Sequence, residues 1–345
     1  VDIEQLKSLI IKVNRRSIIY AVICFVLYFL LCPLSLHILA KQNDFETRFH
    51  DHFLIGSSEH FFCNITPFCS GGQPMLVYLF NQKKIHPKRS IGVIIANFIA
   101  LMIATNLFSV SSLLFFEDFT THFNTLTIWV ISLGFIFNLM MLFFLLFFAP
   151  SEIVRRGLNK LLSKLSNLKI FGRFIRKHKN AVDDYCKNIQ EGLRNIFAHK
   201  LTFTCAVLLR ICSLLFYYSI PYFLLHALGV PLEPFMLPYI ILATSFAITA
   251  MVWLPMPGGT GGIEFAFITI FASFSGVTKE ISIAQTFLWR MLTYYSLIML
   301  GFVCYLSFEI LLRKRYEKKE EVKMNLLLET ADEIAIKDVH ENKTN

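Results

Sequence analysis

Long apolar runs most constrain what this chain can fold into. Six of these runs are long and continuous, and two others, at residues 52–80 and 262–274, are interrupted by polar residues, proline or glycine. Hydrophobic residues make up 55% of the chain, more than the core of a soluble protein of this size accommodates. The sequence therefore predicts an all-α polytopic membrane protein with seven or eight membrane elements. Six runs come close to or exceed the roughly 20 residues that a helix needs to cross a bilayer: residues 17–40, 91–116, 126–149, 201–228, 238–254 and 281–312.

Positive charge is concentrated in two segments, residues 150–200 and the tail from residue 313. The positive-inside rule places both segments in the cytoplasm and predicts a multi-pass protein of the cell membrane. Residues 201–312 must then cross an even number of times, so that residues 262–274 form either a thin span or one arm of a re-entrant hairpin. The acidic loop at Glu117 and Asp118 is expected outside. The rule also assigns smaller basic groups to the cytoplasm: Lys12, Arg15, Arg16, Lys83, Lys84, Lys88 and Arg89.

These patterns divide the chain into four parts. Residues 1–149 and 201–312 form two transmembrane halves, residues 150–200 a cytoplasmic basic loop, and residues 313–345 a charged cytoplasmic tail that is solvated or frayed. A basic stripe between spanning helices is a topological and lipid-binding feature, which argues against a nucleic-acid partner. Leucines recur in the loop at the spacing of a helix that lies in the membrane interface: Leu158, Leu161, Leu162, Leu165 and Leu168.

Each half contains one break in an apolar segment. The first reads NITPFCSGGQP at residues 64–74, and the second reads LPMPGGTGGIEF at residues 254–265. Proline and glycine interrupt a helix there, and paired breaks in two halves are typical of a midplane transport site. Two ordinary surface loops are the alternative. The candidate substrate-binding residues at the breaks are Asn64, Thr66, Pro67, Gly71, Gly72, Gln73, Pro257, Gly258, Gly259, Gly261 and Glu264.

Helix amino termini at the breaks favour negative groups. In the second break a new helix is expected near Ile263, and Glu264 in its first turn satisfies part of that end. The first break has no acidic residue beside Gly71 and Gly72, so that free amides there suit a lipid phosphate better. Lys83, Lys84 and Lys88 follow this break and are suited to gather anionic headgroups.

A carboxylate within the membrane needs a cationic partner, because a charged side chain near the bilayer centre costs roughly 2.5 to 3.5 kcal/mol. Arg290 and Arg210, each inside an apolar run, are the candidate partners of Glu264 and are also candidate substrate-binding residues. A purely structural ion pair is one reading. In the functional reading, Glu264 exchanges Arg290 for a proton or for the amine of an aminoacyl headgroup.

These motifs resemble the transmembrane region of the lysylphosphatidylglycerol synthase family. The resemblance extends over residues 17–312 and is carried by Asn64-Ile-Thr-Pro with Gly71-Gly72-x-Pro74, by Pro255-x-Pro257-Gly258-Gly259-x-Gly261-x-x-Glu264, and by Arg290 to Tyr295. It implies a lipid flippase for aminoacylated phosphatidylglycerol or for polyprenyl or glycolipid substrates. Full-length synthases add a soluble aminoacyl-transferase domain, so the resemblance implies the translocating part without the lysyl transfer. We also expect the first helix of longer members to be missing from this sequence.

The predicted function is therefore a lipid transporter that needs no cofactor and is not an enzyme. Its partners are a membrane phospholipid or lipid-linked substrate and, in one alternative, a separately encoded lipid-modifying enzyme. The rivals are an intramembrane transferase, a membrane component of lysylphosphatidylglycerol synthesis, and a non-transporting partner of such an enzyme. Eight cysteines show no metal-ligand spacing and are read as small apolar residues: Cys24, Cys32, Cys63, Cys69, Cys186, Cys205, Cys212 and Cys304.

Overall fold

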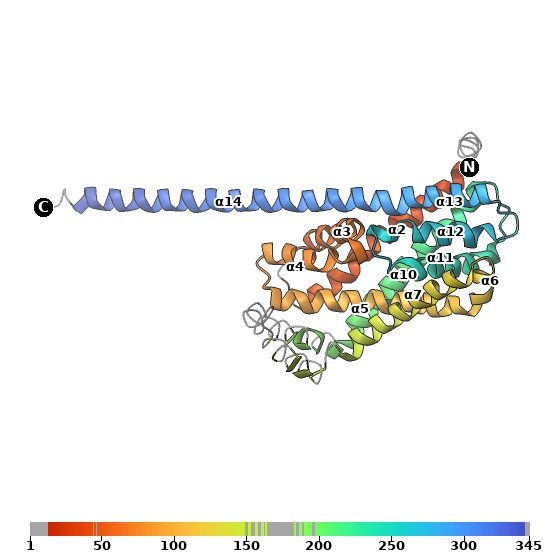
Figure 1. Ribbon diagram of the computed structural model, residues 1–345. Coiled ribbons are helices and arrows are strands. Elements are labelled where there is room, and N and C mark those ends of the chain that lie inside the picture. The colour runs from red at the N-terminus through yellow and green to blue at the C-terminus, as the bar shows by residue number, and fades with distance from the viewer. Residues whose placement is uncertain are drawn as a thin grey trace, which may run out of the picture.

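The computed structural model describes residues 13–43, 45, 47–148 and 197–341, with scattered residues between 151 and 194. Side chains are described as far as residue 324, apart from residues 319 and 323. This part of the chain is helical and contains no strand. Six helical stretches are long and apolar enough to cross a membrane. The all-α polytopic membrane class is therefore confirmed (Figure 1).

Two long helices of equal length form the centre of the molecule: α2 (Arg15–Gln42) and α10 (Lys200–Ala227), with 28 residues each. They pack along each other in opposite directions. At one end, the amide of Asn14 donates to the carbonyl of Ala227 over 2.9 Å. At the other end, the Thr202 hydroxyl donates to Oε1 of Gln42, also over 2.9 Å. These two contacts define opposite faces of the protein, called face A at Gln42 and face B at Asn14.

This antiparallel arrangement corrects one topological prediction. Arg15 and Arg16 begin α2 on face B, whereas Lys200 begins α10 on face A. They cannot share the cytoplasmic side, and the prediction that they do so is wrong. The error arose at the interrupted run 52–80. Because α2 crosses the membrane once, this run had to cross back if Arg15 and Lys83 were both in the cytoplasm.

That run is a re-entrant hairpin, called hairpin 1, which enters from face A and returns to it. Its arms rise about 25 Å and 16 Å at 1.5 Å per residue, too short for the roughly 30 Å hydrocarbon core. Near its base the rings of His52 and Phe80 lie 6.0 Å apart, and Nζ of Lys83 lies 2.9 Å from Oδ1 of Asp51. Hairpin 1 comprises α3 (Phe49–Ile65), the 3-10 turn η1 (Pro67–Cys69) and α4 (Gly72–Gln82).

The second break forms a matching hairpin, called hairpin 2, that enters from face B. The rings of Tyr239 and Phe274 lie 5.2 Å apart at its base, and its turn packs against the turn of hairpin 1. Residues 262–274 are thus an arm of a re-entrant hairpin, the second of the two predicted alternatives. The other arm belongs to Pro234–Met251, one of the six stretches that are long and apolar enough to cross, but the chain turns back at η5. Hairpin 2 comprises α11 (Leu237–Met251), η5 (Pro257–Gly259) and α12 (Gly262–Ala272).

The two halves are structural repeats of inverted orientation. α4 and α12 both have 11 residues, and η1 and η5 both have three. Because the central helices α2 and α10 are antiparallel, one half is inverted relative to the other, as in many transporters. Long helices follow each hairpin and cross to the other face: α5 (Pro87–Ser112) after hairpin 1, and α13 (Lys279–Arg290) with α14 (Ser296–Glu341) after hairpin 2.

The remaining elements connect the halves. On face B, α6 (Phe116–Thr120) leads into α7 (Thr125–Phe143), which returns to face A and packs at Gly134 against the carbonyl of Ala250. α14 continues as one helix past the predicted boundary at residue 313 (Figure 1). The amphipathic helix predicted in the basic loop lies outside the described residues.

The fold predicts which exposed residues share a side of the membrane. Single cysteines in place of Arg16 and His122 should react with an impermeant thiol reagent from one side, because both lie on face B. Cysteines in place of Lys88 and Lys314 should react from the opposite side. Labelling in sealed vesicles of a variant without native cysteines measures this. If residue 16 is labelled together with residue 88, hairpin 1 crosses the membrane and the antiparallel pairing of α2 and α10 is wrong.

Candidate functional site

The turns of the two hairpins have closely similar backbones. Each begins with an extended residue before proline, then enters the left-handed region at Phe68 (φ 56°, ψ 19°) and Gly258 (φ 59°, ψ 20°). The next residues, Cys69 and Gly259, also have positive φ. Glycine adopts this conformation freely, whereas phenylalanine and cysteine pay roughly 1 to 2 kcal/mol each. The turn geometry is therefore retained in hairpin 1 in spite of strain.

Glu264 closes the amino terminus of α12, as predicted. Its Oε2 accepts a hydrogen bond from the amide of Gly261 over 2.7 Å. Its Oε1 lies 2.7 Å from Nε of Arg290. The predicted partnership of Glu264 with Arg290 is therefore present, and one carboxylate serves both the helix end and the cation.

Arg290 connects the turn of hairpin 2 to its surroundings. Its Nη1 donates to the carbonyl of Gly258 over 3.2 Å, and its guanidinium lies 5.3 Å from the ring of Trp289 and 5.1 Å from that of Tyr294. The Tyr294 hydroxyl donates to the carbonyl of Asn64 over 3.3 Å. Tyr294 thus joins the two turns, and a Cβ on Gly258 would overlap its ring.

The donors of Arg290 are only partly used. Its side chain is 8% exposed. Among the described residues, Nη2 has no hydrogen-bond acceptor, and Nε contacts Glu264 without directing its N–H at the carboxylate. A buried guanidinium with unused donors is suited to donate hydrogen bonds to the oxygen atoms of a phosphate or carboxylate.

Arg210 pairs with another carboxylate, and its prediction as an alternative partner of Glu264 is wrong. Its Nη2 lies 4.0 Å from Oε2 of Glu59 in α3, and Nε2 of Gln73 donates to Oε1 of Glu59 over 3.5 Å. The side chains of Arg210 and Glu59 are 5% and 14% exposed. Sequence reasoning missed Glu59, although a lone carboxylate within the interrupted run 52–80 was an available signal.

The polar residues of the first break serve the hairpin itself. The Gly71 amide donates to Oγ1 of Thr66 over 2.9 Å, so it is not free for a phosphate, contrary to the prediction. Oγ1 of Thr66 donates to the carbonyl of Phe62, and Nδ2 of Asn64 donates to the carbonyl of His60. A Cβ on Gly72 would overlap the thiol of Cys63. These glycines therefore permit close packing of the two arms.

A row of aromatic rings connects the two arginine–glutamate pairs. Trp289, which precedes Arg290 in α13, has its ring centroid 5.9 Å from that of Tyr217. The next separations are 4.6 Å from Tyr217 to Tyr28 and 5.6 Å from Tyr28 to His60, the neighbour of Glu59. The two ion pairs thus belong to one polar and aromatic region between the hairpins and the central helices.

The fold and these contacts define a class: polytopic membrane proteins with inverted halves and paired re-entrant hairpins. The family model described as the lysylphosphatidylglycerol synthase TM region matches residues 1–301. The chain belongs to this family, as the sequence motifs predicted. A comparison with curated proteins found no match.

The stability of the Glu264–Arg290 pair can be measured by a double-mutant cycle. Glu264→Gln and Arg290→Met should each cost about 2 to 3 kcal/mol, below the 3 to 5 kcal/mol of a fully buried pair, because Glu264 is 27% exposed. The double variant should lose less than the two single losses combined, because no charge is left unpaired. Thermal unfolding in detergent gives the order of stability of the wild type, the two single variants and the double variant.

The pair of Arg313 and Glu317 supplies a matched control. Its Nε–Oε1 distance is 3.0 Å, but its side chains are 83% and 63% exposed. Arg313→Met and Glu317→Gln should change stability by at most about 0.5 kcal/mol. Additive losses at Glu264 and Arg290 would mean that the two side chains do not interact.

Proposed function

We propose that this chain is a lipid transporter that moves a phospholipid headgroup between leaflets, without a cofactor and without acting as an enzyme. The substrate is an anionic or aminoacylated phospholipid, with a polyprenyl lipid or glycolipid as the wider class. The observation that carries the proposal is the buried Arg290 guanidinium, with unused donors, beside the point where hairpins from opposite faces meet.

A phosphate crossing the hydrocarbon core needs a cation to replace its water. Arg290 has Nη2 available and Nε only partly engaged. Arg210 has a further unused donor, because its Nε has no acceptor among the described residues. Charge-assisted hydrogen bonds to phosphate are among the strongest in proteins. Two such arginines, joined by an aromatic row, form a polar route through an otherwise apolar interior.

Glu264 suits the amine of an aminoacylated headgroup. Its side chain is 27% exposed, so that it is more accessible than its partner Arg290. An incoming ammonium group can replace Arg290 at the carboxylate, which frees the guanidinium for the phosphate of the same lipid. This exchange keeps every charge paired during passage, which avoids the cost of an isolated buried charge.

The inverted halves support alternating access of the two leaflets. Hairpin 1 enters from face A and hairpin 2 from face B, and rocking of one half against the other would expose the turns to each face in turn. The larger basic clusters favour face A as the cytoplasmic side. On this orientation, Arg15 and Arg16 lie on the outer side.

Two rivals make different predictions. An intramembrane transferase would generate a new lipid product, which mass spectrometry of the lipid extract detects. A non-transporting partner of a separate lipid-modifying enzyme would tolerate substitution of Arg290 and Glu264. The transport test below therefore separates all three functions.

Transport is tested by flipping of fluorescent phosphatidylglycerol and its lysylated form in liposomes that contain the purified protein. Arg290→Met should reduce the initial rate about tenfold or more, the effect of losing one charge-assisted hydrogen bond. Glu264→Gln should slow the lysylated lipid more than the unmodified lipid, because it removes the site for the amine.

Arg313→Met is the matched control, because it makes the same chemical change at an exposed position. Its rate should equal that of the wild type. Normal flipping by a folded Arg290→Met variant would contradict the proposed route. Absence of flipping in the wild type, together with a modified lipid product, would assign the protein to the transferase class.

A further inference from the structure

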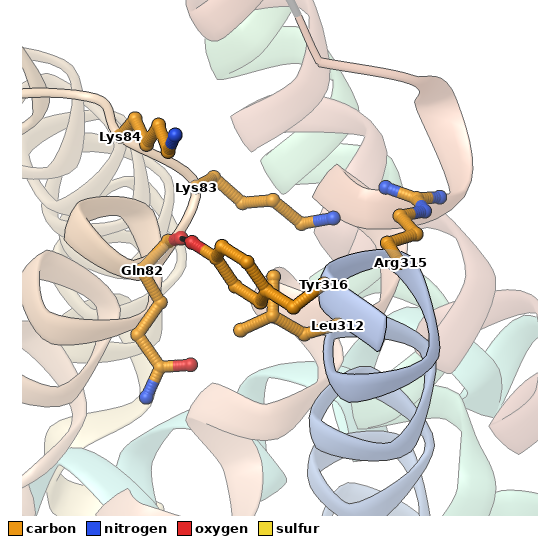
Figure 2. Close-up of a pocket in the computed structure, with 6 residues that line it drawn as sticks. All are labelled: Gln82, Lys83, Lys84, Leu312, Arg315 and Tyr316. Carbon is orange, nitrogen blue, oxygen red and sulfur yellow. Dashed lines mark hydrogen bonds between the residues drawn. The ribbon is translucent and has the colours of Figure 1, made fainter. Parts of the chain in front are cut away.

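A cavity of about 130 Å³ lies on face A, between the carboxyl end of α4 and the side of α14. By the same measure one water molecule needs only about 10 to 15 Å³, so this space accommodates a phosphate group. Figure 2 shows Lys83 extending toward Arg315 above the ring of Tyr316, whose hydroxyl donates to the carbonyl of Gln82 over 3.2 Å. The cavity is lined by Gln82, Lys83, Lys84, Leu312, Arg315 and Tyr316.

The cavity has an excess of positive charge. Asp51 engages two of its cations, at 2.9 Å from Nζ of Lys83 and 3.2 Å from Nη1 of Arg315. Lys84 is exposed and forms no ion pair among the described residues. Glu309 accepts a hydrogen bond from Gln82 nearby. Three cations and two carboxylates leave one net positive charge, which matches a phosphodiester monoanion.

Lys84 occupies a backbone position that favours glycine. Its φ is 63°, and it ends α4 with hydrogen bonds from the Lys84 amide to Asn81 and from the Ile85 amide to Phe80. Glycine is the usual residue at such a helix end because a side chain is strained there. Strain of this kind is found at functional sites. Lys84 lines the cavity, and its ammonium group forms no ion pair among the described residues.

The cavity lies where α14 changes from an apolar to a charged surface. Val303 and Ile310 are 55% and 54% exposed on the side of the membrane interior, and Arg313 and Lys314 follow immediately. This change marks the level of the lipid headgroups. A lipid whose phosphate is bound at this level can lay its acyl chains along the exposed apolar surface of α14.

We propose that this cavity binds the phosphate of an anionic phospholipid from the leaflet at face A. Lys84 supplies the free charge, Lys83 and Arg315 are held in place by Asp51, and Leu312 with the ring of Tyr316 contacts the glycerol and upper acyl chain. The site lies at the base of hairpin 1, at the opposite end of α3 from the turns. Binding here does not depend on transport, so that the two proposals stand or fall separately.

The test is titration of the purified protein in uncharged detergent with short-chain phosphatidylglycerol, followed calorimetrically. Lys84→Gln and Lys84→Gly should each weaken binding about fivefold, as expected for one lysine at an anionic lipid, and Lys84→Arg should retain it. Because Lys84→Gly also relieves the strained backbone, its melting temperature should equal or exceed that of the wild type. Weaker binding with undiminished stability excludes misfolding as the cause.

Lys88→Gln is the matched control, since Lys88 is exposed on the same face but does not line the cavity. This variant should bind the lipid as tightly as the wild type. If it binds as weakly as the Lys84 variants, the proposal is overturned in favour of diffuse surface charge. Wild-type affinity in the Lys84 variants would also overturn it. Inorganic phosphate binding as tightly as the lipid would assign the cavity to a free anion, and equal binding of short-chain diacylglycerol would assign it to an apolar groove.

Discussion

Broken backbone is tolerated at membrane depth only where protein covers it, and here each hairpin covers the turn of the other. The carbonyl of Gly258 receives Arg290, and the carbonyl of Asn64 receives Tyr294. Both donors come from the segment around the π-helical turn Met291–Tyr295 that joins α13 to α14. The same segment therefore donates a hydrogen bond to a carbonyl in each turn region and supplies the guanidinium that pairs with Glu264.

The backbone repeat is symmetric, but the chemistry placed on it is not. Glu264 and Pro74 occupy equivalent positions in α12 and α4, two residues after the first residue of each helix. A carboxylate caps one helix, while the first turn of the other contains a proline, which lacks an amide hydrogen. The first half obtains its carboxylate elsewhere, from Glu59 in the arm of its hairpin. The carboxylates of the two ion pairs therefore come from different elements of the two halves.

Several features followed from local properties of the sequence. The apolar runs, the two breaks and the helix start beside Glu264 depend on residues close together in the chain, namely on hydropathy and on the backbone preferences of proline and glycine. The pairing of Glu264 with Arg290 was also predictable, because a charge within an apolar run needs an opposite charge. Family membership followed from the same motifs.

Other features depended on how distant segments pack. The length of an apolar run did not reveal that residues 52–80 turn back within the membrane. Because they turn back, Arg15 and Arg16 lie on the opposite side from the one predicted. The partner of Arg210 is Glu59, 151 positions away in the numbering, and the Gly71 amide is occupied by Thr66 across the turn. The sequence by itself determined that the chain is a helical membrane protein with two broken elements, because hydropathy and the positions of proline and glycine are local properties. Only the tertiary structure decided which elements cross and which charges meet, because both depend on the antiparallel packing of α2 with α10 and on the contact between the two turns.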